Sequence, residues 1–151
     1  MVPKIIDDRA PAAPVSSVSS RLVAIEKNAK IQILRSGDWI PLPQASQRVV
    51  IGLDERTLQE WLRTDRVFAL SHEGNIFVPV YGFDSKTHHP LAGLEAVVAV
   101  LKTQNDAWGM AYWFASPNNF LGGNPPKALL AYAPERLLSA ALEEVGGVMH
   151  G

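Results

Sequence analysis

The histidines and the adjacent carboxylates are the side chains of this chain that could carry chemistry. His88 and His89 stand side by side and could be taken for metal ligands. Neighbouring side chains diverge, and no cysteine or His-x3-His partner stands nearby, so we expect the pair in a solvated loop. Adjacent carboxylates occur at three places, Asp7–Asp8, Asp54–Glu55 and Glu143–Glu144. Nothing in the sequence buries one of them, as a general acid would require.

Two further signatures of catalysis are missing from the sequence. It contains no Gly-rich phosphate loop followed by Lys-Ser or Lys-Thr, and no Gly-x-Ser-x-Gly elbow. We therefore predict a protein that is not an enzyme and that uses no metal and no cofactor.

The composition sets the broad class of the protein. With 151 residues, of which 47% are hydrophobic and 19% charged, the chain can bury one ordinary core or two small lobes. Fourteen basic and fifteen acidic residues nearly cancel, so no global charge points to nucleic acid or to an anionic membrane. The absence of cysteine suits a reducing compartment, and no run approaches about 18 apolar residues. We expect a cytoplasmic protein with no membrane partner.

The C-terminal third, residues 107–146, predicts helices joined by turns of Pro, Asn and Gly. Residues 108–115 are apolar on nearly every side, which predicts a helix enclosed by its neighbours. Pro117 disfavours helix at the residue before it, and the asparagines after it tolerate turns. We expect Phe120 and Leu121 to point inward, and Gly122–Gly123 to permit a backbone path closed to other residues.

Two more helices are predicted after this turn. The first is short and covers residues 127–131, after Pro126. The second opens at Pro134 and turns an apolar stripe inward, made of Leu138, Ala141, Leu142 and Val145. Gly146–Gly147 is expected to end it. The segment after the double glycine is either a frayed end or an adaptable peptide that enters a partner's cleft about a glycine hinge.

This third of the chain resembles a known family. It resembles the toxin-binding domain of Xre/MbcA/ParS antitoxins in three successive features. These are the run from Pro117 to Gly123, Pro126 before Ala128–Leu130, and a helix over residues 135–141. The resemblance covers about the last forty residues. It implies a non-catalytic partner of a toxin, often a RES-domain toxin acting on NAD, which is blocked when the antitoxin's C-terminal segment covers its active-site cleft. The implied partner-binding residues are Asn118, Asn119, Leu121, Gly122, Gly123, Pro126, Val148, Met149, His150 and Gly151.

The N-terminal half begins with a Pro-rich stretch, residues 1–17, which we predict to be a flexible arm. From Ser17 to about Arg35 the apolar residues recur at intervals of four and three, which predicts a helix. Its seam is Val18, Leu22, Ile25, Ala29 and Ile33. It is expected either to pack on the body or to form a dimer contact.

Residues 41–83 predict a helix-turn-helix followed by a hairpin. Residues 39–43 read as an extended link, residues 44–49 as a short helix, and Asp54 as the N-cap of a helix with Leu58, Trp61 and Leu62 inward. Two apolar runs, 66–70 and 76–83, flank a Gly-containing turn and predict a β-hairpin. The whole resembles the winged modules of excisionase-like and MerR-like DNA binders, in which the second helix enters the major groove.

The residues that would lie nearest DNA are Arg56, Thr57, Gln59, Glu60 and Arg63. Between residues 48 and 66 the charges of four arginines and four carboxylates cancel. A surface that contacts DNA phosphates normally carries an excess of positive charge. The segment is therefore either a DNA-binding module or a module kept for dimerisation or packing.

These observations predict a mainly α protein with a small β-hairpin, of the α+β class. A helix-turn-helix lobe, residues 18–84, precedes a C-terminal helical bundle, residues 85–147, and a tail, residues 148–151. The helix expected over residues 91–104 belongs to the second lobe. We expect an antitoxin of a type II toxin-antitoxin pair that covers the active site of a RES-like toxin, forms a homodimer or a hetero-oligomer with the toxin, and has operator DNA as a second partner. The alternative is a stand-alone winged helix-turn-helix transcriptional regulator.

Overall fold

The computed structural model describes residues 12–150 and is mainly helical with a small antiparallel sheet, as predicted. The elements are α2 (Ala12–Leu34), β1 (Trp39–Pro41), α3 (Leu42–Arg48), α4 (Glu55–Arg63), β2 (Leu70–His72), β3 (Asn75–Pro79), the 3-10 turn η1 (Val80–Gly82), α5 (Ala92–Leu101), α6 (Ala107–Ala115), the 3-10 turns η2 (Asn119–Leu121) and η3 (Pro126–Ala128), and α7 (Pro134–His150). Among these described residues, no helix has the length and apolarity needed to cross a bilayer.

The sheet has three strands rather than the two of a simple hairpin. β2 and β3 form the predicted hairpin, but its turn is only Glu73–Gly74, whose φ values are 49° and 81°. Two-residue hairpin turns of type I′ need such positive φ values at both positions. The segment expected to be an extended link contributes β1, which pairs with β3 and gives the order β1-β3-β2. β1 is an edge strand, and a proline is tolerated at its end because that position needs no second partner strand.

α3 and α4 form the predicted helix-turn-helix. The Thr57 N–H donates to Asp54 Oδ1 at 2.8 Å, so Asp54 caps α4 as expected. Gly52 makes the turn between the helices with a φ of 80°. Leu58 and Trp61 are buried, which leaves the opposite face of α4 to solvent.

The Asp54 cap makes a pH-dependent contribution to stability. The hydrogen bond from the Thr57 N–H holds the pKa of the Asp54 carboxyl below its ordinary value of 3.8. A lowered folded-state pKa stabilises the protein above the unfolded-state value, and this contribution is lost as the pH falls through the folded-state value. Asp54→Ala should therefore be less stable than the wild type at pH 7, and the difference should shrink below a pH of about 4. Urea unfolding at both pH values measures this, and an equal difference at both would contradict it.

One hydrophobic cluster joins the two predicted lobes. Phe114 of α6 lies in its middle and is fully buried, with ring centroids 5.5 Å from Phe68 and 5.4 Å from Tyr81. Trp39 of β1 contacts Phe68 edge-on at 5.3 Å. Burial raises the pKa of the Tyr81 phenol well above its ordinary value. The sheet and α6 thus share one aromatic core.

α6 is less enclosed than its composition predicts. Met110, Ala111 and Phe114 are buried, but the rings of Trp108, Tyr112 and Trp113 are only partly covered. The expectation of burial on nearly every side is therefore wrong. Large aromatic rings can cover apolar surface with one edge while the other stays at the solvent boundary.

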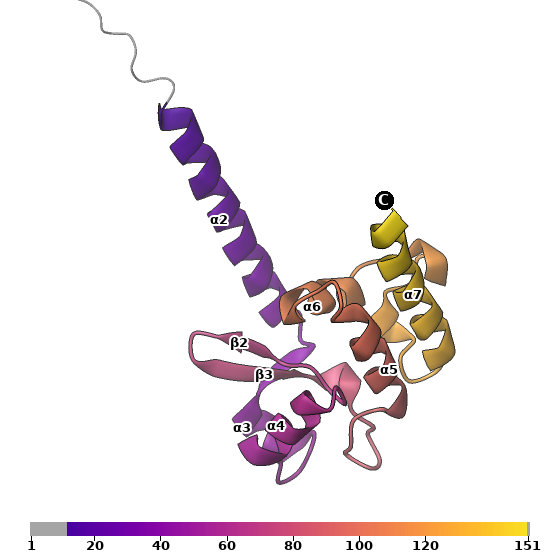
Figure 1. Ribbon diagram of the computed structural model, residues 1–151. Coiled ribbons are helices and arrows are strands. Elements are labelled where there is room, and N and C mark those ends of the chain that lie inside the picture. The colour runs from indigo at the N-terminus through magenta and orange to yellow at the C-terminus, as the bar shows by residue number, and fades with distance from the viewer. Residues whose placement is uncertain (1–11, 151) are drawn as a thin grey trace, which may run out of the picture.

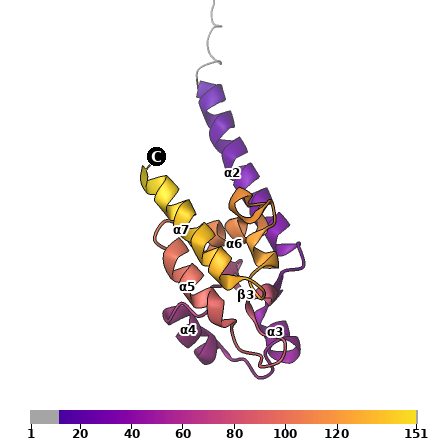
Figure 2. The same cartoon turned by 90° about the vertical axis from the view of Figure 1, so that its right-hand side faces the viewer.

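α2 projects from the body, as Figures 1 and 2 show. It begins at Ala12, so the predicted flexible arm is wrong for residues 12–17, and residues 1–11 lie outside the described part of the chain. Only the last turns of α2 contact the body, where Ile33 is buried and the Lys30 ammonium lies 5.2 Å from the centre of the Trp108 ring. Of the two alternatives for this helix, packing on the body therefore holds only for the end of the seam, at Ala29 and Ile33.

α5 and α7 pack against each other in the C-terminal half, and Gly93 of α5 lies against Pro134 at the start of α7. A Cβ at that position would lie 2.4 Å from the Pro134 Cβ, so only glycine allows this contact. α7 buries Leu137, Ala140 and Ala141, whereas Leu142 is mostly exposed. The predicted stripe is therefore rotated, because the contact with α5 selects the buried face. The short helix expected over residues 127–131 is only the 3-10 turn η3, followed by further turns.

Candidate functional site

The turn of residues 118–124 is closed by its own hydrogen bonds. Asn118 Oδ1 accepts from the Phe120 N–H at 2.9 Å, and the Asn118 carbonyl accepts from the Gly123 N–H at 2.8 Å. The Asn124 side-chain amide donates to the Leu121 carbonyl at 3.1 Å. Gly122 and Gly123 have φ values of 69° and 90°, which residues with a Cβ rarely adopt. The turn is therefore a preformed surface feature.

The residues of this turn divide into exposed and buried ones. Asn119, Gly122 and Gly123 are exposed and Asn118 is partly exposed. Leu121 and Pro126 are buried, so they support the turn from below and do not face solvent. Phe120 was expected to point inward, and this is wrong, because its side chain is 53% exposed. In a 3-10 turn successive side chains diverge by about 120°, so Phe120 and Leu121 cannot both point inward.

A hollow of about 420 Å³ lies between this turn and α7. Its lining comes from Asn118, Phe120, Ala140, Glu143, Glu144 and Gly147. A second hollow of about 270 Å³ adjoins it, sharing Asn118 and Glu144 and reaching Trp113 of α6. We call the turn 118–123 and this part of α7 the C-terminal face. It combines an exposed aromatic ring, that of Phe120, with two exposed carboxylates, those of Glu143 and Glu144.

The predicted tail is not separate from α7. The helix continues through Gly146–Gly147 to His150, so the expectation that the double glycine ends it is wrong. Val148, Met149 and His150 form the last turn of the helix, and Gly151 lies outside the described residues. A Cβ at Gly146 or Gly147 would meet nothing within 4 Å, so neither glycine serves a close contact.

Two alanine substitutions should therefore have opposite effects on stability. Gly146→Ala should raise the free energy of unfolding by about 0.5–1 kcal/mol, because glycine is a poor helix former. Gly123→Ala should lower it by about 1–2 kcal/mol, because its φ of 90° strains a residue with a Cβ. Chemical denaturation measures both. A loss of stability in Gly146→Ala would indicate that the helix ends at the double glycine, as the sequence predicts.

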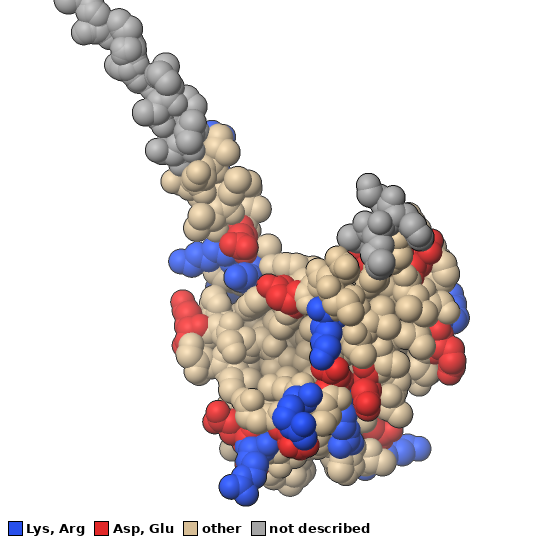
Figure 3. All heavy atoms as spheres, in the orientation of Figure 1, with Lys and Arg blue, Asp and Glu red and all other residues tan. Residues whose placement is uncertain are grey.

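The outer face of α4 carries the residues predicted to lie nearest DNA. Arg56, Gln59, Glu60 and Arg63 are exposed, while Thr57 is partly covered and its N–H donates to the Asp54 cap. Arg63 forms a salt bridge with Glu60 at 2.5 Å, and this hydrogen bond raises the pKa of the Arg63 guanidinium. Figure 3 shows basic and acidic side chains interspersed over the lower part of the molecule, where α3 and α4 lie. The charge of this face is thus mixed, as the sequence indicates.

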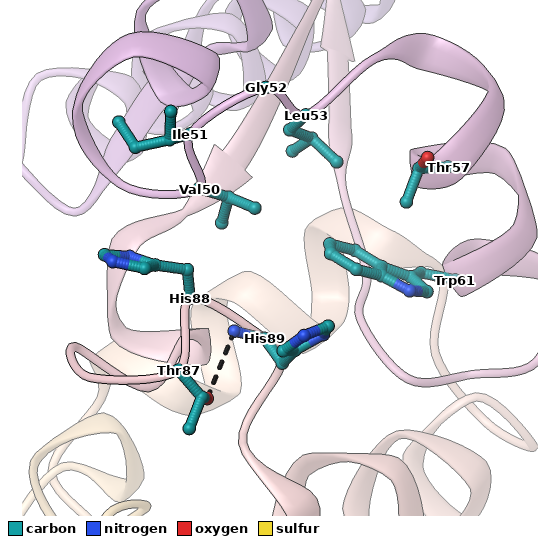
Figure 4. Close-up of a pocket in the computed structure, with 9 residues that line it drawn as sticks. All are labelled: Val50, Ile51, Gly52, Leu53, Thr57, Trp61, Thr87, His88 and His89. Carbon is teal, nitrogen blue, oxygen red and sulfur yellow. Dashed lines mark hydrogen bonds between the residues drawn. The ribbon is translucent and has the colours of Figure 1, made fainter.

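A pocket of about 320 Å³ lies between the α3–α4 turn and the loop of residues 87–89 (Figure 4). His88 Nδ1 lies 2.8 Å from the Val49 carbonyl oxygen, and the His89 ring lies 6.1 Å from Trp61. The two imidazoles point toward opposite sides of the pocket in Figure 4, and both residues are exposed, which confirms the expected solvated loop. Within residues 12–150, no cluster of three or more His, Asp or Glu side chains could hold a metal ion.

A search of protein families, of curated proteins and of solved structures finds no match to this chain.

Proposed function

We propose that this chain is an antitoxin that binds a protein toxin through its C-terminal face and blocks the toxin's active site. The observation that carries the proposal is the exposed Phe120 ring on a preformed turn beside the acidic hollow of α7. The resemblance of residues 117–141 to the toxin-binding domain of Xre/MbcA/ParS antitoxins supports the same function. It also suggests a RES-like toxin that consumes NAD, and a cytoplasmic complex.

The mechanism is binding, and the chemistry belongs to the toxin. An aromatic side chain that enters a pocket of a partner is a common centre of binding energy. The preformed turn reduces the entropy lost on association, because its backbone is already held by internal hydrogen bonds. Glu143 and Glu144 favour a toxin whose active-site rim is basic. Docking of this face, with the last turn of α7 beside it, excludes the toxin's substrate.

Phe120→Asp tests this proposal. We expect the tagged wild-type chain to co-purify with the toxin-sized product of the adjacent gene and to abolish that protein's NAD consumption. Phe120→Asp should lose both effects, because a charged group replaces the aromatic contact. Ile51→Asp is the matched control, since Ile51 is 66% exposed on the α3–α4 turn and far along the chain from the C-terminal face. Equal inhibition by Phe120→Asp and the wild type would remove the C-terminal face from the mechanism.

A second candidate function is DNA binding by the N-terminal half. It is favoured by the order α2-β1-α3-α4-β2-β3, with β1 joining the hairpin, which is the element order of a winged helix-turn-helix. α4 would then be the recognition helix, with Arg56 and Gln59 on its exposed face. The mixed charge of that face predicts weak binding outside the specific site. This function can accompany toxin binding, as autoregulation, or stand alone.

A gel shift with DNA from upstream of the chain's own gene tests this second function. Binding should weaken between low and physiological salt, because phosphate contacts release counterions. Arg56→Glu should abolish the shift, while Arg136→Glu, on the exposed side of α7, should leave it unchanged. Equal shifts by both variants would exclude α4 as the recognition helix. A shift without any toxin, from a chain that fails to inhibit one, would favour the stand-alone regulator.

A further inference from the structure

The middle of α2 exposes apolar side chains that nothing in the rest of the described chain covers. Every residue from Ser17 to Asn28 is exposed, and the helix stands clear of the body in both views (Figures 1 and 2). Leu22 is 61% exposed and Ile25 is 64% exposed. Helical segments in proteins draw most of their stability from packing of an apolar face, so this stretch is expected to find a partner.

We propose that this stripe is the seam of a parallel coiled coil formed with other copies of the same chain. Val18, Leu22, Ile25 and Ala29 are separated by four, three and four residues, which is the alternation of d and a positions in a heptad. The seam ends at the body, where Ala29 is partly covered and Ile33 is buried. The same spacing continues to Val15, the next a position toward the N-terminus.

The charges beside the seam favour a second copy of this chain as the partner, with its helix parallel to α2. Arg21 precedes Leu22 and occupies a g position, while Glu26 follows Ile25 and occupies an e position. In a parallel coiled coil, a g residue faces the e residue five positions later on the neighbouring helix. Arg21 of each copy then faces Glu26 of the other. In an antiparallel pair g faces g and e faces e, so these opposite charges would not meet.

The residue types of the seam also bear on the number of copies. Leucine at a with isoleucine at d favours three or four strands in parallel coiled coils. The seam is only about two heptads long, so association should depend on protein concentration. The parallel direction would hold all bodies at the same end of the coiled coil, with one α4 on each. This inference does not depend on a toxin or on DNA.

Sedimentation equilibrium of the purified chain tests the seam. The wild type should have a mass of at least twice, and by its residue types three or four times, that of the chain. Leu22→Asp and Ile25→Asp should be monomeric and less helical by circular dichroism, with an unchanged body. Val23→Asp is the matched control, because Val23 is equally exposed but lies outside the a and d positions. A wild type that stays monomeric at the highest soluble concentration would overturn the proposal, as would an equal effect of all three variants.

A charge exchange tests the direction. At low salt, Arg21→Glu should raise the dissociation constant about tenfold, because each interhelical ion pair becomes a repulsion. Adding Glu26→Arg to the same chain should restore association. If Arg21→Glu changes nothing while Leu22→Asp dissociates the assembly, the helices associate through the seam but are not parallel.

Discussion

Replacing Phe114 with alanine should lower the free energy of unfolding by about 3–5 kcal/mol, the usual cost of removing a large aromatic side chain from a closed core. Phe114 is fully buried and touches three other aromatic rings. It stacks on Phe68, lies against Tyr81, and meets the Trp113 ring edge-on at 5.1 Å. Small domains have a total stability of about 5–15 kcal/mol, so the variant should be close to unfolding.

Urea unfolding followed by tryptophan fluorescence measures this loss. Tyr132→Ala is the matched control, because Tyr132 is an aromatic residue that is 86% exposed. Its effect should stay within about 0.5 kcal/mol. Because Phe114 connects α6 to the sheet, both halves should unfold in one transition in the wild type. Two separate transitions in the wild type, with only the second shifted in Phe114→Ala, would contradict a shared core.

Leu121→Ala should lower the free energy of unfolding by about 2–5 kcal/mol, because Leu121 is fully buried beneath the turn of residues 118–123. The neighbouring variant Phe120→Ala should cost far less stability, since Phe120 is about half exposed. The two substitutions remove similar apolar groups from adjacent positions. They therefore separate support of the turn from contact with a partner.

The two variants should rank differently in affinity for the toxin than in stability. Under the proposed function, Phe120→Ala should bind the toxin much more weakly than the wild type while keeping its stability. Leu121→Ala should lose binding only to the extent that its turn is disordered, and a stabilising osmolyte should recover part of that binding. Isothermal titration of both variants gives the comparison. If Phe120→Ala binds normally and a folded Leu121→Ala variant does not, then Leu121 and not Phe120 makes the contact with the toxin.

Local sequence signals predicted much of the fold. Asp54 caps α4 through a hydrogen bond that spans three residues, and Pro117 ends α6 by restricting the residue before it. Such interactions lie within one turn of the backbone, so the sequence contains all of their partners. The hairpin was predicted for the same reason, although Glu73–Gly74 forms a shorter turn than expected.

The candidate site was located from the sequence only as a segment. The turn of residues 118–126 was expected to be a partner-binding surface. The sequence placed both Phe120 and Leu121 inside, which is right only for Leu121, and the family resemblance counted the buried Leu121 and Pro126 among the partner-binding residues. The 3-10 geometry of η2 and the packing of Leu121 against the body decide which side chains face solvent. A pattern of apolar residues cannot distinguish these two neighbours.

The sequence by itself determined the helical class, the Asp54 cap of α4 and the end of α6 before Pro117, because those features depend on hydrogen bonds and steric limits between residues close along the chain. Only the tertiary structure decided that β1 joins the sheet through β3, that α7 buries Leu137 in place of Leu142, and that α2 stands away from the body. Each of these depends on surfaces that meet across tens of residues. The element that packs against a helix selects which side of the helix is buried. The spacing of apolar residues along the helix does not predict which element that will be.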